Sequence, residues 1–235
     1  MVSPYPFREF GSIDELTSMI ADATKGWDTR WYRGTKTPAH ALLPKLFRDP
    51  SWERREGYIS VEFRRRARPH LQTIQTPFEW LCAMQHYGFP TRLLDWSESL
   101  AVALYFTIRP VGPDLAAPTI WVLNPFELHA FTGRKRGVPV IPIATNEEVI
   151  SNSDMAFGDD LEGTSKTTSR YPLPVIPDFL FNRLATQNGA FTIHGKDSRA
   201  LESIVPEQKQ SMLLKFVARH DRVKSSSVKY PEAID

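Results

Sequence analysis

The residues of this chain best suited to chemistry lie in one short run from Gln85 to Trp96, with the sequence QHYGFPTRLLDW. The run holds His86, Arg92 and Asp95 between two apolar segments. An arginine or aspartate beside a core must be paired and hydrogen-bonded to be tolerated, so these charged residues indicate a structural or functional role. A glycine and a proline in the middle predict a turn. Polar groups gathered where this loop enters an apolar helix are typical of a binding or catalytic site.

Two further patches carry groups of the same kind. One is a predicted strand that breaks at a glycine, and it consists of Tyr32, Arg33, Gly34 and Thr35. The other spans residues 183–192, RLATQNGAFT, and contains Gln187. An arginine presents a planar fork of donors, which suits a phosphate or a ribose diol. A neighbouring glycine lets the backbone approach a flat carboxamide such as nicotinamide.

Together the three patches resemble the FRG domain family, which is named for an aromatic-Arg-Gly motif. Here that motif is Tyr32-Arg33-Gly34, and the QHYGFPTRLLDW run matches the most specific signature of the family. The resemblance extends over roughly residues 28 to 194. We therefore divide the chain into an N-terminal helix and lead-in (1–27), the domain itself (28–217) and a flexible tail (218–235).

The order of the patches is also similar, more distantly, to the ADP-ribosyltransferase superfamily. Its members carry an Arg-Gly or His-Gly on a first strand, a Ser-x-Ser before a helix, and a Glu or Gln on a later strand. In this chain the matching segments are Arg33-Gly34, Ser97-Glu98-Ser99 and Gln187. The similarity implies a core of two small, roughly perpendicular sheets around a cleft that holds NAD.

The same similarity implies an NAD-dependent enzyme that transfers ADP-ribose to a protein or nucleic-acid acceptor, in a bacterial or phage toxin or in antiphage defence. It implies catalytic roles for Arg33 at the ribose or phosphate, Ser97 at the ribose and Gln187 at the transition state. The residues implied to contact NAD are Tyr32, Arg33, Gly34, Thr35, His86, Arg92, Asp95 and Ser99. NAD is the substrate, and no metal is implied.

Position 187 departs from the strongest transferase pattern, which has a glutamate there. A glutamine can hydrogen-bond a ribose hydroxyl but carries no charge to stabilise a cationic transition state. Asp95 and Glu98 are the nearest carboxylates by sequence that could substitute. Two other functions therefore stay open: a non-catalytic module that binds a nucleotide or macromolecule, and an NAD glycohydrolase in which water replaces the acceptor.

Several of these residues also have an ordinary structural interpretation. Arg33 could pair with a carboxylate at a strand end, and His86 could be a buried residue that fixes the loop. Arg92 and Asp95 stand three apart, and we favour an ion pair between them that braces the loop. Ser97 is well suited to cap the helix that follows, whatever else it does.

The composition, 41% hydrophobic and 24% charged, predicts a globular chain, and a net charge of +2 is too mild to imply nucleic acid by itself. Cys82 is the only cysteine, and the six histidines lack ligand spacing, so we expect no disulfide framework and no zinc site. No signal peptide or membrane-length apolar stretch is visible, which predicts a cytoplasmic protein without membrane contact. The densest charge run is a solvated helix face or a set of phosphate contacts, formed by Arg64, Arg65, Arg66 and Arg68.

Helical patterns dominate the first half of the chain and strand patterns the second, which predicts an α+β fold. The expected helices span residues 13–23, 52–71, 77–84 and 97–106. The expected strands span residues 30–35, 119–123 and 189–194, with shorter strands or extended segments at 138–143, 172–177, 201–204 and 212–217. Residues 151–169 are polar and predict a mobile loop.

Overall fold

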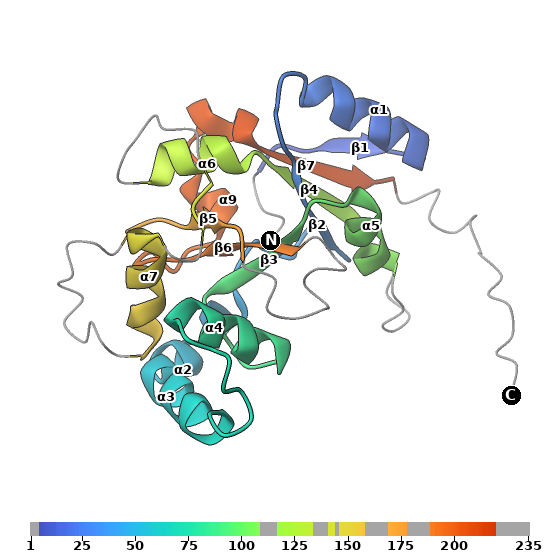
Figure 1. Cartoon of the computed structure of the whole chain (residues 1–235). Coiled ribbons are helices and arrows are strands. Elements are labelled where there is room, and N and C mark those ends of the chain that lie inside the picture. Colours follow the sequence, from blue (N-terminus) through green and yellow to red (C-terminus); the bar gives the residue numbers. More distant parts are fainter. Residues whose placement is uncertain are drawn as a thin grey trace, which may run out of the picture.

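The computed structural model describes residues 5–108, 117–133, 141–143, 146–157, 169–177 and 189–219, which form a mixed α/β structure around one sheet (Figure 1). The strands are β1 (Arg8–Phe10), β2 (Trp31–Thr35), β3 (Leu93–Ser97), β4 (Thr119–Leu123), β5 (Leu173–Val175), β6 (Gly189–Ile193) and β7 (Leu213–Ala218). The helices are α1 (Ile13–Ala23), α2 (Pro50–Glu53), α3 (Glu56–Ala67), α4 (Pro77–His86), α5 (Leu100–Ile108), α6 (Pro125–Thr132), α7 (Glu147–Asp154) and α9 (Leu201–Ile204). Short 3₁₀ turns are η1 (Lys45–Arg48), η2 (Met155–Phe157) and η3 (Glu207–Met212).

The sheet has seven described strands in the order β1-β7-β4-β2-β3-β6-β5. β1 and β7 are parallel, and the other described neighbours are antiparallel. β2 pairs along its length with β4, and β3 with β6, but β2 and β3 meet at a single residue pair, Tyr32 with Ser97. In place of two separate small sheets, the structure therefore has one sheet whose halves share one pair and then diverge.

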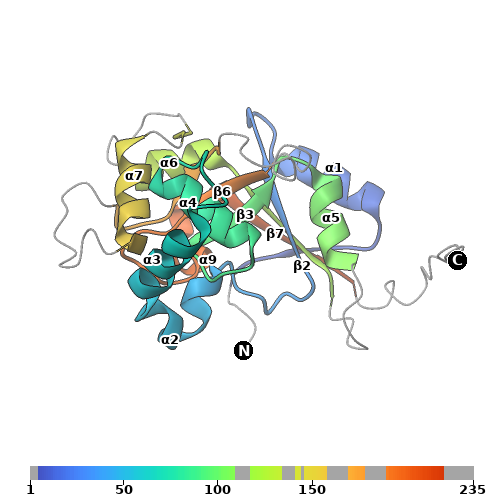
Figure 2. The ribbon, with the colours of Figure 1, turned by 60° about the horizontal axis from the view of Figure 1, so that its bottom comes forward.

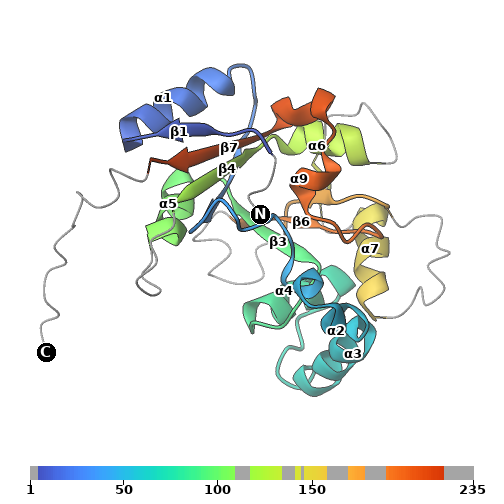
Figure 3. The same ribbon diagram turned by 180° about the vertical axis from the view of Figure 1, so that it is seen from behind.

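Helices cover both faces of the sheet. Along β4, Ile120 and Val122 face α1 and α5, whereas Trp121 and Leu123 face α6 and α9, the alternation expected of a strand buried on both sides. A third apolar cluster joins α3, α4 and α7 to β3, β5 and β6. Figure 2 shows α1 and α5 at the opposite end of the molecule from α7, and Figures 1 and 3 show α2, α3 and α4 grouped beyond β3.

Local sequence signals placed several elements correctly. Helix α1 has the predicted bounds because Ser12 caps it, its Oγ accepting from the Glu15 amide at 3.1 Å. The predicted strands at 30–35, 119–123 and 189–194 are confirmed as β2, β4 and β6. Helix α5 is the most apolar of these elements, and no helix among the described residues is long and apolar enough to cross a bilayer.

Other expectations were wrong in specific ways. The helix expected at 52–71 is split into α2 and α3, and residues 201–204 form α9 rather than a strand, because periodicity cannot classify so short an apolar run. Residues 151–157 continue α7 and η2 rather than a loop, after a cap by Asn146. Of the edge strand expected at 138–143, residues 138–140 lie outside the described residues, and Ile143 forms an isolated bridge to Ile176.

His194, directly after β6, predicts a pH dependence of folding. Its ring is fully buried, and this burial lowers its pKa from 6.5 to about 3, with the nearby Arg92 cation acting in the same direction. The unfolded chain therefore binds the proton more readily, and stability falls as the pH drops from about 6.5 towards 3. Between pH 7.5 and 4.5 we expect this group to cost roughly 2–3 kcal/mol of the free energy of unfolding.

Urea denaturation of the wild type and of His194→Asn at both pH values measures this effect. The variant should lose less stability on acidification by about that amount, whereas His70→Asn, which removes an exposed histidine, should behave like the wild type. Equal acid sensitivity of wild type and His194→Asn would contradict the prediction.

Candidate active-site cavity between β2 and β3

A cavity of about 920 Å³ lies where β2 and β3 diverge. Its walls come from both strands, from α4 and α5, and from the loop of residues 36–48. Seven predicted site residues line it together: Tyr32, Arg33, Gly34, Thr35, His86, Asp95 and Ser97. The missing strand pairing thus opens a space in which the first two sequence patches meet, of a size usual for ligand sites.

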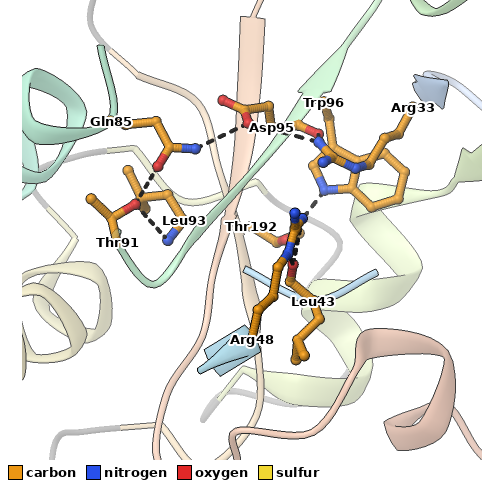
Figure 4. A network of polar contacts seen from close by, with 9 residues as sticks. All are labelled: Arg33, Leu43, Arg48, Gln85, Thr91, Leu93, Asp95, Trp96 and Thr192. Carbon is orange, nitrogen blue, oxygen red and sulfur yellow. Dashed lines mark hydrogen bonds and ion pairs between the residues drawn. The ribbon is translucent and has the colours of Figure 1, made fainter. Parts of the chain in front are cut away.

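Arg33 bridges the gap between the diverging strands. Its Nη1 donates to the backbone carbonyl of Asp95 at 2.6 Å and lies 3.7 Å from the Asp95 carboxylate (Figure 4). Burial lowers the pKa of Arg33, and Asp95 opposes that shift, so the guanidinium stays charged. With 20% of its side chain exposed, Arg33 is both a strand-to-strand brace and a donor at the cavity surface.

Asp95 is held in place from α4. Gln85 Nε2 donates to Asp95 Oδ2 at 3.0 Å, and the Thr91 hydroxyl donates in turn to Gln85 Oε1 (Figure 4). The side chain of Asp95 remains 56% exposed. It is the sole carboxylate among the described residues that line the cavity, since Glu98 is not one of them.

Arg92 does not pair with Asp95, and it lies outside the lining of the cavity. Its Nε donates to Glu56 Oε1 at 2.7 Å, and its Nη2 pairs with the other oxygen of the same carboxylate. Nη1 donates to the carbonyls of His194 and Gly195 at 2.9 and 3.1 Å. The expected ion pair was wrong because residues 93–97 form a strand, in which side chains three apart point to opposite faces.

Ser97 and Ser99 have different places from those expected. Ser97 ends β3 and lines the cavity, and its Oγ accepts from the Ser99 amide at 3.0 Å. The cap of α5 is Ser99 rather than Ser97, since the Ser99 Oγ accepts from the Val102 amide at 3.4 Å. Ser99 is therefore part of the helix start and not of the described lining.

The sequence analysis did not identify the basic side of the cavity, which is formed by Lys36, His40 and Arg48. Arg48 is fixed by two donations to the Leu43 carbonyl, at 3.1 and 3.0 Å (Figure 4). Burial and the Arg48, Arg33 and Lys36 cations lower the pKa of His40. Lys36 and Arg48 therefore give the cavity a positive side, which favours an anionic ligand such as a phosphate, whereas the lowered pKa of His40 favours its neutral form at pH 7. No motif signals them, because they are spread over the segment from the end of β2 to η1.

Two buried charges hold this loop against the sheet. Lys215 Nζ donates to the Pro38 carbonyl at 2.9 Å, and the Leu42 amide donates to the Glu202 carboxylate at 3.1 Å. Both side chains are buried, and burial lowers the pKa of Lys215 and raises that of Glu202. The loop that carries Lys36 and His40 is thus anchored at two backbone groups by residues far away in the sequence.

Gln187, with the rest of residues 178–188, lies outside the described residues. From the third patch, Phe191 on β6 reaches the cavity. Cys82, the buried cysteine of α4, also lines it, and burial raises the pKa of its thiol. Among the described residues no group of three His, Cys, Asp or Glu side chains is arranged to hold a metal ion.

Comparison with known proteins gives one family. No curated protein and no solved structure matches the chain. The family model of the FRG domain matches residues 28–113, which include β2, α4, β3 and most of the residues that line the cavity. Over residues 28–113 the chain is therefore similar to the FRG domain.

Proposed function

We propose that the cavity between β2 and β3 binds NAD and that the protein transfers ADP-ribose from NAD to an acceptor macromolecule. The observation that carries the proposal is the placement of one carboxylate, Asp95, beside Arg33 in a cavity that Lys36 and Arg48 also line. This arrangement pairs a site for a developing positive charge with a site for phosphates. The fold proposed with it is an ADP-ribosyltransferase-like core in which the two halves of the sheet enclose the cleft.

The reaction requires stabilisation of charge more than a strong nucleophile. The bond between ribose C1′ and the nicotinamide nitrogen breaks, and nicotinamide leaves with the electron pair, which leaves positive charge on the ribose. The Asp95 carboxylate supplies the negative charge that stabilises this state. An acceptor hydroxyl or amine then bonds to C1′ and releases its proton to solvent. Gln187 keeps its proposed role of orienting the ribose.

The other lining residues have roles that follow from their chemistry. Arg33 donates to the ribose or the adjacent phosphate, and Ser97 offers its hydroxyl to the ribose. Lys36, His40 and Arg48 face the pyrophosphate. The positive side of the cavity is suited to the two negative charges of that group. The exposed Asp95 carboxylate replaces the glutamate of the strongest transferase pattern, so a glutamine at position 187 is compatible with catalysis.

Arg33→Ala and Asp95→Asn test this proposal. Purified protein is incubated with adenine-labelled NAD and cell lysate, and nicotinamide release and label transfer are followed together. We expect each variant to reduce both signals about 100-fold or more, because each removes a charge that the transition state needs. The matched controls Arg199→Ala and Asp197→Asn alter an arginine–aspartate pair outside the cavity and should keep wild-type activity.

The outcomes separate the functions that remain open. Release of nicotinamide with label on a macromolecule supports the transferase, and release without transfer makes the protein an NAD glycohydrolase. NAD binding by calorimetry without release makes it a binding module. Full activity of a folded Arg33→Ala variant, or no NAD binding by the folded wild type, overturns the proposal.

A further inference from the structure

A second concave surface lies between α3 and the turn that follows α4, and we call it the α3 groove. It has a volume of about 670 Å³, and its floor is apolar, with Ile59, Phe63 and Leu71 among the residues that form it. The turn separates the α3 groove from the cavity between β2 and β3. His86 lines that cavity, whereas its neighbour Tyr87 lines the groove. The two sites are therefore adjacent.

Exposed aromatic rings are concentrated at the α3 groove. Tyr58, Tyr87 and Phe89 all line it and are 70%, 57% and 39% exposed. Phe63 lies beneath two of them, with ring centroids 4.9 Å from Phe89 and 6.0 Å from Tyr87. Large aromatic rings held on a packed base but open to solvent offer flat apolar faces to a ligand.

The chain around the groove is strongly basic. Residues 45–70 hold eight Lys or Arg residues against four Asp or Glu residues, although the whole chain has a net charge of only +2. Of these carboxylates, Glu56 forms a buried ion pair with Arg92. Glu62, at the groove, is shared by Arg65 and Arg66. The lining of the α3 groove itself holds one arginine, Arg66, and one carboxylate, Glu62, and the excess of positive charge lies on the exposed arginines beside it on the chain.

The four arginines singled out in the sequence are not equivalent. Arg64 lies over the Phe157 ring, 4.7 Å from its centroid, and so packs on the fold. Arg65, Arg66 and Arg68 are exposed. The pairs that Arg65 and Arg66 make with Glu62 lie at the surface, where such pairs are worth little, so a phosphate can recruit these arginines at low cost.

We propose that the α3 groove binds single-stranded nucleic acid. Exposed rings beside arginines are the combination that such strands require, since bases stack on the rings while phosphates pair with the cations. Tyr58, Tyr87 and Phe89 would receive bases, and Arg65, Arg66 and Arg68 would receive phosphates. A duplex keeps its bases stacked inside and cannot use the rings, so single strands are preferred. This inference does not depend on NAD chemistry.

Fluorescence anisotropy with a labelled single-stranded oligonucleotide of about 12 nucleotides tests the inference on the full chain. We expect the double variant Tyr58→Ala/Tyr87→Ala to bind about 10-fold or more weakly, because each base that no longer stacks on a ring costs on the order of 1–3 kcal/mol. Tyr58→Phe/Tyr87→Phe should bind like the wild type. Arg65→Gln/Arg68→Gln should flatten the dependence of log K on log salt by about 0.7 for each phosphate that the variant no longer neutralises.

Matched controls lie on other surfaces. Tyr105→Ala removes a 53% exposed ring from α5, and Arg219→Gln removes a surface arginine near β7, and neither should alter binding. Circular dichroism confirms that each variant is folded. No binding by the wild type at about 50 mM salt, equal affinity for duplex and single strand, or equal losses in the control variants would each overturn the inference. Binding of an acidic protein but no oligonucleotide would also overturn it.

Discussion

Replacing Arg92 with alanine is expected to lower the free energy of unfolding by roughly 3–5 kcal/mol. The side chain is 3% exposed, and its guanidinium satisfies the Glu56 carboxylate and the carbonyls of His194 and Gly195. Removing it leaves a carboxylate that is only 11% exposed without its partner, as well as two unpaired carbonyls. Breaking a buried pair on one side in this way is among the most destabilising changes a protein can suffer.

Urea denaturation at pH 7.5 measures the loss. Arg219→Ala is the matched control: it pairs with Glu15 at the surface, where the two side chains are 44% and 36% exposed, so its removal should cost less than about 1 kcal/mol. If Arg92→Ala does not fold, Glu56→Gln keeps the shape, removes the charge and should shift stability in the same direction. A loss below about 1 kcal/mol for Arg92→Ala would show that the pair contributes nothing beyond a surface contact.

Arg92 and Asp95 belong to one sequence motif, yet Arg92 pairs inside the fold and Asp95 lines the cavity. This difference shows how far the sequence alone could predict the site. The composition of the Gln85–Trp96 run correctly predicted costly, paired groups, but it could not say which residue pairs with which. A loop was expected, yet residues 93–97 form a central strand in which only Asp95 is exposed, so the usual alternation of polar and apolar residues is absent. The strand period then sends Asp95 to the cavity and leaves Arg92 in the scaffold.

The parts of the fold that were predicted are those set by neighbouring residues. The cap at Ser12 and the β-branched run of β4 are local signals, and both elements were found. Sheet order is set by distant pairings, such as β1 beside β7, which no local pattern contains. The basic side of the cavity is missed for the same reason, since Lys215 and Glu202 position its loop from far along the chain.

Replacing Gly34 with alanine is the other substitution with a large expected effect. The sequence suggested that this glycine lets the backbone approach nicotinamide, and Gly34 does line the cavity. The structure adds a packing reason: a Cβ at this position would lie 1.9 Å from the Ala103 carbonyl oxygen and 2.8 Å from the Thr107 side chain. The close approach of β2 to α5 therefore depends on the absence of a side chain.

The obstructing atom is backbone of α5, so it can yield only if the helix shifts off the sheet. We expect Gly34→Ala to lower the free energy of unfolding by about 3 kcal/mol or more. Gly88→Ala is the matched control, because Gly88 has a φ of 80° but open space around it. Its backbone strain alone should cost about 1–2 kcal/mol. Denaturation midpoints of the two variants, measured side by side, distinguish the cost of the steric clash at position 34 from the cost of backbone strain at position 88. A cost for Gly34→Ala no greater than that for Gly88→Ala would mean that α5 tolerates the shift, and that the glycine serves the ligand rather than the packing.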